Sequence, residues 1–199
     1  MRSILVLLED IVRLEFGPGE LASVRAVASA HVSDAVSGTG SAVRVTAFVR
    51  ALCQVRRRPL PEVYAFVGLK LAQSVVTDFP MVTRDRQSTR LVLLQINQLA
   101  PAVLDALVPG VEVPAFDVEL IDAESVRVSF TGTPEMASLL EGAVRGLGQH
   151  FGERVEPTRA SPPSYAPNRR LIDIKITPDR RTEDAPSPTG VDRRKFFSF

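Results

Sequence analysis

The chain has 199 residues, 45% of them hydrophobic and 24% charged, with a formal net charge of +1. This balance is typical of a globular protein, and the small net charge with scattered basic residues argues against a nucleic-acid partner. One cysteine and two histidines exclude an internal disulfide and a zinc-like cluster. The cysteine usage favours a reduced, cytoplasmic location.

Hydrophobic residues recur at helical spacing through the first part of the chain. The apolar run at the start is interrupted by Glu9 and Asp10 long before the roughly 20 residues of a membrane span are complete. We therefore expect no span there, and a buried first helix instead. The predicted helices, separated by glycine- or proline-containing breaks, cover residues 3–16, 20–35, 42–58 and 62–76.

A fifth helical pattern covers residues 89–108 and contains Pro101 in its interior. A proline there removes one backbone hydrogen bond and clashes with the carbonyl four residues earlier. We expect this helix to be kinked or split at Pro101.

Beyond residue 114 the hydrophobic period changes from 3.6 to 2. The stretches "AFDVELID" and "SVRVSFTG", separated by the turn-like "AES", predict an antiparallel hairpin. Residues 135–151 return to the helical period, and "RVEPTRASPPSYAPN" predicts a short strand and a proline-rich loop before a last strand, "RRLIDIKI". The fold class is therefore α+β, with a helical N-terminal half followed by a small antiparallel sheet and a packed helix.

These patterns suggest one domain over residues 1–176, made of a helical subdomain (1–108) and an α/β subdomain (109–176). Residues 177–199 hold three prolines and nine charges without an apolar period, so we expect a disordered tail. The tail ends in three basic residues and three phenylalanines, which are costly to expose. We regard them as candidates for binding a partner protein or for folding back onto their own domain: Arg193, Arg194, Lys195, Phe196, Phe197 and Phe199.

Several stretches, in this order and spacing, resemble the heme nitric oxide/oxygen-binding (H-NOX) domain family. They are "ILVLLEDIVRLEFG", "LPEVYAFVGLKL", "TDFPMV", "LVPGVEVPAFDVELIDAESVRVSF" and "LLEGAVRGLGQHFGERV". The resemblance covers about 175 residues. It implies a sensor module that passes a signal to a histidine kinase, a cyclase or a chemotaxis protein.

The resemblance also implies where a heme would be held, and those positions carry the wrong residues. The family's proximal histidine falls on Pro101, or on Ala100 if the register slips by one, and neither side chain can bind iron. The family's Tyr-x-Ser-x-Arg motif, which grips the heme propionates, falls on Phe130, Gly132 and Pro134. The phenol, the hydroxyl and the guanidinium are all absent, so we expect no heme.

Other candidate iron ligands are few. His150 belongs to the helix that, in the family, lies behind the hairpin and faces away from the heme. His31 lies in the second predicted helix, where a solvent-facing or core-capping role is the simpler interpretation. Cys53 lies on an apolar helix face, where a lone cysteine is usually a small buried hydrophobic residue.

The remaining polar patterns have structural explanations. Adjacent Glu9 and Asp10 cannot act as an acid and base pair, and we expect Asp117, Glu119 and Asp122 on the outer side of a strand. The glycines at 142, 146 and 148 lie inside a predicted helix, which argues against a phosphate loop. We expect Gly142 and Gly146, four residues apart on one face, to let the hairpin approach this helix closely. Residues 56–58 are three arginines that end a helix, where they complement its dipole or meet an acidic partner.

We therefore expect a non-enzymatic regulatory module with an H-NOX-like fold that has lost its cofactor, binds no metal and acts by contact with a signalling protein. One alternative is a receptor for an apolar small molecule or lipid in the vacated pocket. A second alternative is a heme-based gas sensor that uses an unexpected ligand. No nucleophile, base and orienting residue occur together as an enzyme would need.

Overall fold

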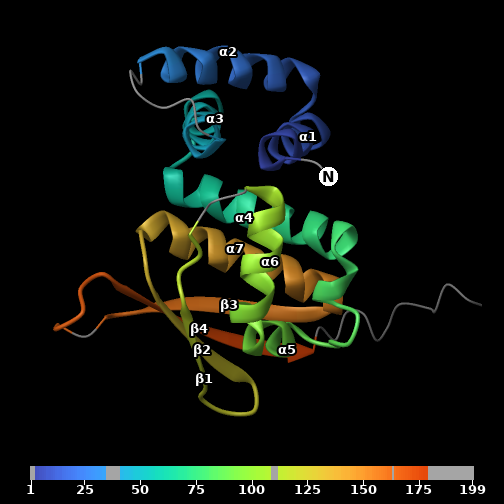
Figure 1. Cartoon of the computed structure of the whole chain (residues 1–199), viewed down its shortest axis with the longest axis vertical. Helices are drawn as coiled ribbons and strands as arrows, with labels where there is room; N and C mark the ends of the chain where they lie inside the picture. The colour runs from blue at the N-terminus through green and yellow to red at the C-terminus, as the bar shows by residue number, and fades with distance from the viewer. Residues whose placement is uncertain (1–2, 35–40, 109–111, 163, 179–199) are drawn as a thin grey trace, which may run out of the picture.

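The computed structural model describes residues 3–34, 41–108, 112–162 and 164–178. At the N-terminal end of the chain, helices are stacked from one end of the molecule toward its middle (Figure 1). Gly17 alone separates the first two helices, with a φ of 90° that glycine adopts without strain. Pro18 then starts the second helix two residues earlier than predicted, in a first turn that needs no proline N–H. These helices are α1 (Ile4–Phe16), α2 (Pro18–Asp34), α3 (Ser41–Arg56) and α4 (Leu60–Asp78).

The long helical pattern that follows is divided in two. A 3₁₀ turn, η1 (Pro80–Val82), leads into α5 (Thr89–Leu94) and α6 (Ile96–Leu107). The helical pattern splits at Gln95, and Pro101 lies inside α6, so the prediction of a split at Pro101 is wrong.

Tertiary contacts account for the position of this break. The Arg86 guanidinium donates to the Gln95 side-chain oxygen (Nε to Oε1, 3.1 Å) and to the Met81 carbonyl (2.6 Å), so it ties the break to the turn before it. Pro101 leaves the Asn97 carbonyl without its helical partner. Because Asn97 and Pro101 are both exposed, water can satisfy that carbonyl.

An antiparallel sheet forms the other end of the molecule, in the order β1-β2-β4-β3. Its strands alternate as predicted, with Val126, Val128, Ile172 and Ile174 fully buried on the face toward the helices. Helix α7 (Pro134–Phe151) crosses this face (Figure 1). The α+β fold is therefore confirmed. The strands are β1 (Phe116–Leu120), β2 (Ser125–Thr131), β3 (Glu153–Ala160) and β4 (Arg169–Pro178).

Strand β4 continues to Pro178, two residues into the segment predicted as a tail. The rest of the predicted tail, including its basic and aromatic end, lies outside the described residues. No helix in the described part of the chain is both long enough and apolar enough to span a bilayer.

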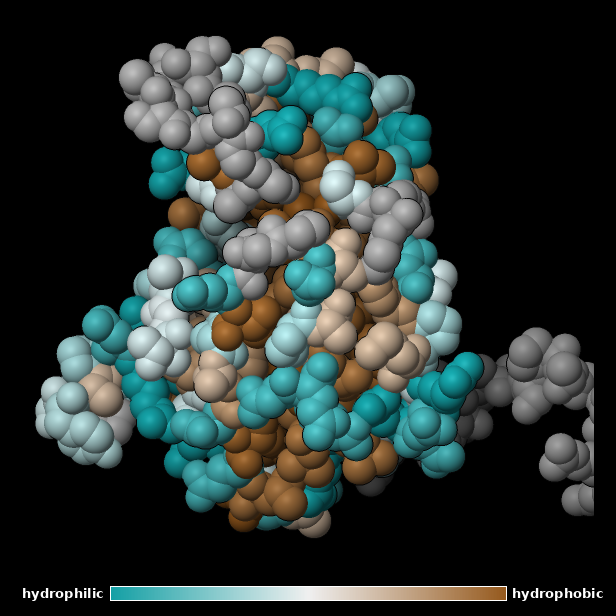
Figure 2. Space-filling view, viewed as in Figure 1, coloured by the Kyte–Doolittle hydropathy of each residue, from teal (hydrophilic) through white to brown (hydrophobic). Residues whose placement is uncertain are grey.

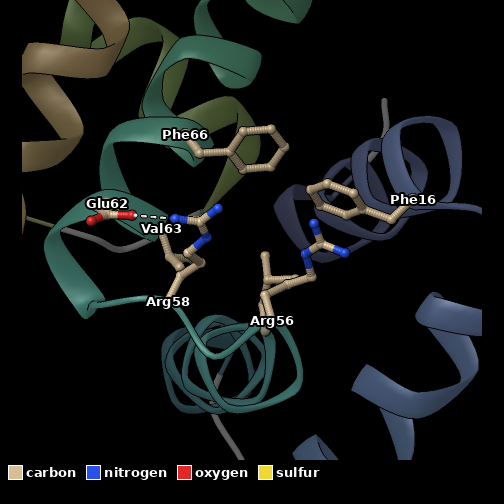
Figure 3. Close-up of a pocket in the computed structure, with 7 residues that line it drawn as sticks. Phe16, Arg56, Arg58, Glu62, Val63 and Phe66 are labelled. Atoms are coloured by element: carbon tan, nitrogen blue, oxygen red, sulfur yellow. Dashed lines mark ion pairs between the residues drawn. The ribbon is translucent and has the colours of Figure 1, made fainter.

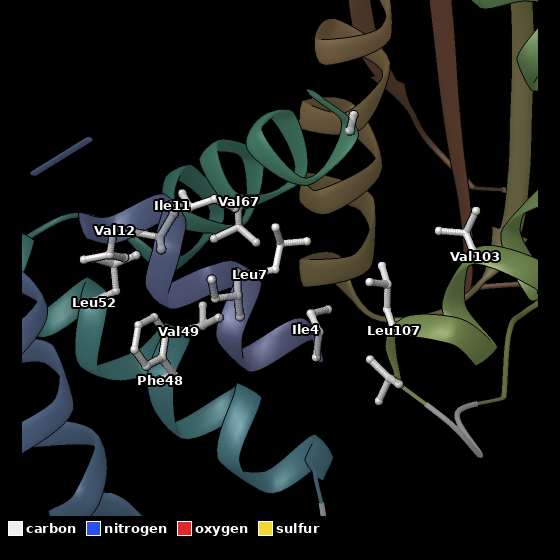
Figure 4. Packing of buried hydrophobic residues seen from close by; sticks show 14 of the residues in the cluster. Ile4, Leu7, Ile11, Val12, Phe48, Val49, Leu52, Val67, Val103 and Leu107 are labelled. Atoms are coloured by element: carbon white, nitrogen blue, oxygen red, sulfur yellow. The ribbon is translucent and has the colours of Figure 1, made fainter. Parts of the chain in front are cut away.

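The core has two clusters that meet at α7. The larger cluster packs helices α1, α2, α3, α4 and α6 together and includes Leu7, Val12, Val49 and Leu52 (Figure 4). The smaller cluster joins the sheet to α5 and α7. Helix α7 thus has the helical layer on one side and the sheet on the other.

Glycines let α7 lie against α4 at backbone distance. A Cβ added to Gly142 would stand 1.8 Å from the Ala65 carbonyl oxygen, and one added to Gly146 would stand 2.6 Å from that of Leu69. The prediction that these two glycines face the hairpin is therefore wrong, since they face α4. Gly148 is the one that faces the sheet, where an added Cβ would stand 2.4 Å from the Val155 side chain.

Candidate functional site

An apolar cavity of about 220 Å³ lies among α4, α5, α6 and α7. Every residue that lines it is a glycine, alanine, valine, leucine or isoleucine, so its wall is hydrocarbon. Ile4 of α1 and Leu107 of α6 contribute to the wall, and Figure 4 shows them on facing helices. Helix α6 supplies the largest share of the lining: Ile96, Leu99, Ala100, Val103, Leu104 and Leu107.

The two positions considered for an iron ligand differ in orientation. Ala100 lines the cavity, and Pro101 is exposed on the outer side of α6. The side chain that faces the cavity at this level is therefore a methyl group. A methyl group cannot coordinate iron.

The end of the hairpin is packed with hydrophobic groups. Phe130 is 2% exposed and its ring lies 5.4 Å from that of Phe116. Gly132 lies against the Phe130 ring, and Pro134 is the first residue of α7, after the N-cap Thr133 whose hydroxyl accepts from the Met136 N–H (3.4 Å). These residues form a helix start and an aromatic pair, and none of them lines the apolar cavity.

Sequence reasoning missed one cation beside this hairpin end. The Arg170 side chain donates from Nε to the Gly132 carbonyl oxygen at 3.0 Å. Arg170 comes from β4 and is paired in register with Phe130, so only the strand alignment brings it there. It lines a separate pocket of about 280 Å³ and not the apolar cavity.

The other arginines of this second pocket are held by ion pairs. Arg159 donates to the Glu141 carboxylate (2.5 Å) and to the Ser138 hydroxyl (2.7 Å), and the Glu141 hydrogen bond raises the pKa of Arg159. Arg169 donates to the Asp117 carboxylate (2.5 Å). These guanidinium groups are therefore engaged within the protein.

The other side chains that could bind iron lie away from the cavity. His150 is exposed at the end of α7, as expected for a residue facing away from the pocket. Its ring packs edge-on against that of Phe151, with 4.9 Å between the ring centroids. His31 is partly exposed near the end of α2. Cys53 is half-buried on α3, where burial raises the pKa of its thiol.

Burial likewise raises the pKa of the Tyr64 phenol on α4, and Tyr64 does not line the cavity. Within the described ranges, no three histidine, cysteine, aspartate or glutamate side chains are grouped so that they could hold a metal ion.

A smaller pocket of about 180 Å³ lies where α1, α3 and α4 meet (Figure 3). The Arg56 guanidinium covers the Phe16 ring at 4.3 Å and pairs with Glu20 at 3.3 Å. Arg58 pairs with Glu62 at 3.6 Å. Two of the three arginines that end the helix thus already have acidic partners within the chain.

The acidic residues singled out from the sequence are surface groups. Glu9 pairs with Arg25 (2.6 Å) and Asp10 with Arg13 (2.7 Å), so the two carboxylates diverge as predicted. Asp117, Glu119 and Asp122 are exposed, also as predicted. These residues do not form a catalytic group.

Residues 3–159 match the family model described as Haem-NO-binding. A comparison with curated protein sequences gave no match.

Solved H-NOX structures share the fold. An S. oneidensis H-NOX protein in the Fe(II)NO ligation state superposes with a TM-score of 0.70 at 15% identity, over 87% of this chain and 97% of that one. The Shewanella woodyi H-NOX protein in the Fe(II)CO state superposes with a TM-score of 0.67 at 17% identity, over 94% of this chain and 97% of that one. The Fe(II) unliganded H-NOX protein from K. algicida superposes with a TM-score of 0.66 at 13% identity, over 87% of this chain and 95% of that one.

Proposed function

The chain belongs to the heme nitric oxide/oxygen-binding (H-NOX) family, and we propose that it is a non-enzymatic signalling module that has lost heme binding and acts through a partner protein. The single observation that carries this proposal is the lining of the cavity. Axial ligation of heme iron needs an imidazole, thiolate, thioether or phenolate. The wall offers only hydrocarbon, with Ala100 facing inward on α6.

The size of the cavity supports the same proposal. At about 220 Å³ it is smaller than the roughly 300–1,000 Å³ of pockets that enclose drug-sized ligands. A porphyrin would have to displace side chains from α6 or α7.

The hairpin end adds a third argument. Phe130, Gly132 and Pro134 offer no side-chain donor to the carboxylates of a porphyrin. Hydrogen bonds to charged groups contribute about 1.5–3 kcal/mol each, so their loss removes much of the specific affinity. Arg170, which donates to the Gly132 carbonyl oxygen, lines a different pocket.

Titration of the purified protein with hemin tests the loss of heme. We expect no saturable one-to-one complex that survives gel filtration. An S. oneidensis H-NOX protein treated identically is the positive control, because it is known in Fe(II) states. A stable one-to-one complex would refute the proposal and favour the alternative of a heme-based gas sensor with an unexpected ligand.

The contact with the partner is the second half of the proposal. The family resemblance suggests a kinase, a cyclase or a chemotaxis component, bound through the helical half and the tail residues 193–199. A pull-down of such candidates with the full chain and with a chain lacking residues 190–199 tests the role of the tail. Equal recovery of the partner by both proteins would refute it.

The cavity also favours a second candidate, a receptor for a small apolar molecule. An apolar cavity of roughly 150 Å³ can stay dry and bind benzene or xenon, and this cavity is larger. Mass spectrometry under native conditions tests whether the purified protein carries a guest, and Ala100→Leu should lower its occupancy by narrowing the cavity. If no guest is found, this candidate fails while the partner-binding proposal stands.

A further inference from the structure

Four large aliphatic side chains are exposed at the sheet end of the molecule. Leu91 and Leu94 lie on α5, Leu120 is the last residue of β1 and Ile121 follows it, with exposed fractions between 41% and 47%. Leu120 stands at the end of β1, which is an edge strand of the sheet. We call these four residues the α5–hairpin patch.

The two parts of the patch are held together. The Arg90 guanidinium on α5 donates to the Ala123 carbonyl oxygen in the β1–β2 turn at 2.6 Å. Figure 2 shows hydrophobic residues gathered over the hairpin at the lower end of the molecule. Because exposed aliphatic residues grouped in this way mark interaction sites, the patch calls for an occupant.

Acidic groups border the patch. Asp122 and Glu124 stand in the β1–β2 turn, and the Glu153 carboxylate accepts from the backbone N–H of Thr89, the first residue of α5 (2.9 Å). The Glu124 N–H donates to the Asp122 carboxylate at 2.7 Å and lowers its pKa, which keeps that group charged.

The cations at this border are fewer. Lys175 lies 3.9 Å from Glu124, and Arg90 is bonded to a backbone carbonyl. An occupant with apolar and basic residues would therefore complement the patch.

The chain leaves the described structure beside this patch. The Ile176 N–H donates to the Glu124 carbonyl oxygen at 2.7 Å, and Pro178 is paired in register with Glu153. Strand β4 thus ends between the β1–β2 turn and the start of α5. Any segment that follows Pro178 starts next to the acidic border.

The segment that follows has the required composition. Residues 193–199 read "RRKFFSF", with three basic residues and three phenylalanines. The 14 residues 179–192 link it to β4. A random coil of 14 residues would span about 20 Å on average, and a fully extended chain of that length at most about 50 Å. This length is enough for residues 193–199 to reach either part of the patch.

We propose that residues 193–199 dock on the α5–hairpin patch of the same chain. The phenylalanines cover Leu91, Leu94, Leu120 and Ile121, and the three basic side chains lie beside the acidic border. Tail and patch then mask each other, and a partner that captures the tail uncovers the patch. This inference does not depend on the loss of heme.

Hydrogen exchange of the full chain tests the docking. Replacing Phe196, Phe197 and Phe199 with serine should speed amide exchange in residues 90–94 and 118–124 by about tenfold, which corresponds to 1.4 kcal/mol of lost protection. Arg180→Ser with Arg181→Ser, a change in the linker, is the matched control and should leave exchange unchanged. Amides of α4 and α7 should not respond to either variant.

Equal exchange in the wild type and the phenylalanine variant would overturn the proposal. Protection that disappears on tenfold dilution would also overturn it, because the tail would then come from a second copy.

Trypsin cleavage after Arg193, Arg194 or Lys195 tests the role of the patch residues in the contact. Leu91→Ser with Leu94→Ser should accelerate this cleavage severalfold. Leu14→Ser, which alters an exposed leucine on α1, is the control and should not. Equal cleavage rates in the patch variant and the wild type would contradict docking at the patch.

Discussion

The two sides of α7 differ in what they can hold. On one side, α7 borders a cavity of about 220 Å³ whose lining has no polar side chain. On the other side, at its N-terminal end, it borders a pocket rich in guanidinium groups, where Arg159 and Arg169 are paired with carboxylates within the chain. The apolar cavity and the guanidinium groups are therefore on different sides of one helix. A fold that is shared with heme proteins does not by itself bring the groups for heme together.

The largest expected effect on the free energy of unfolding comes from the close packing of α7 against α4. Gly142→Ala would put a methyl group 1.8 Å from the Ala65 carbonyl oxygen, and backbone cannot move aside easily. We expect a loss of about 3 kcal/mol in the free energy of unfolding, measured by urea denaturation. Gly19→Ala, which meets nothing within 4 Å in α2, should instead add about 0.5–1 kcal/mol. Similar stability of both variants would show that α4 and α7 are not in backbone contact.

The next effect concerns the cavity side. Ala100→Leu should fill part of the cavity and raise the free energy of unfolding by about 1 kcal/mol. Ala102→Leu, on the exposed side of the same helix, should change it by less than about 0.5 kcal/mol. If both variants behave alike in denaturation, then the cavity does not lie beside Ala100.

A smaller effect is expected on the arginine side. Glu141 is largely shielded and Arg159 is about half exposed, so their pair should contribute up to about 1 kcal/mol. A double-mutant cycle with Glu141→Gln and Arg159→Gln measures this coupling energy. A value of several kcal/mol would mean that the pocket is far less hydrated than the exposure of Arg159 indicates.

The smallest effect is expected on the outer face of the sheet, opposite the face that α7 covers. The Arg127 guanidinium lowers the pKa of the Asp173 carboxylate. Because the folded pKa lies below the unfolded value of about 3.9, the stabilisation is complete above that pH and is lost as the pH falls through the folded value. Asp173→Asn should therefore be less stable than the wild type at pH 7 by under about 1 kcal/mol. Denaturation at a series of acidic pH values should show this difference closing below pH 3.9, and a constant difference would contradict the assignment.

Periodicity alone was enough to predict most elements of the fold. The change from a helical to an alternating pattern after residue 114 correctly separated the helices from the hairpin, and the last two strands were also expected. The break at Gln95 was not predictable, because the helical pattern continues through it and the Arg86 contact is tertiary.

The candidate site was less accessible to sequence reasoning. The family pattern places the proximal histidine at Pro101, or at Ala100 if the register slips by one. The folded helix decides between them, because Ala100 lines the cavity and Pro101 is exposed outside it. Arg170 reaches the hairpin end through strand pairing, which depends on register and not on sequence proximity. The α5–hairpin patch brings Leu91 and Leu94 to residues that lie 26 or more positions further along the chain, so no local sequence pattern indicates it.

The most direct test of the central claim, that this cavity lacks the groups to hold heme iron, is the absorption spectrum of the full chain. The protein should be produced with an ample heme supply and passed through gel filtration. We expect no Soret band at a level near one heme per chain. A stoichiometric band that disappears when a residue of α6 is replaced would contradict the claim.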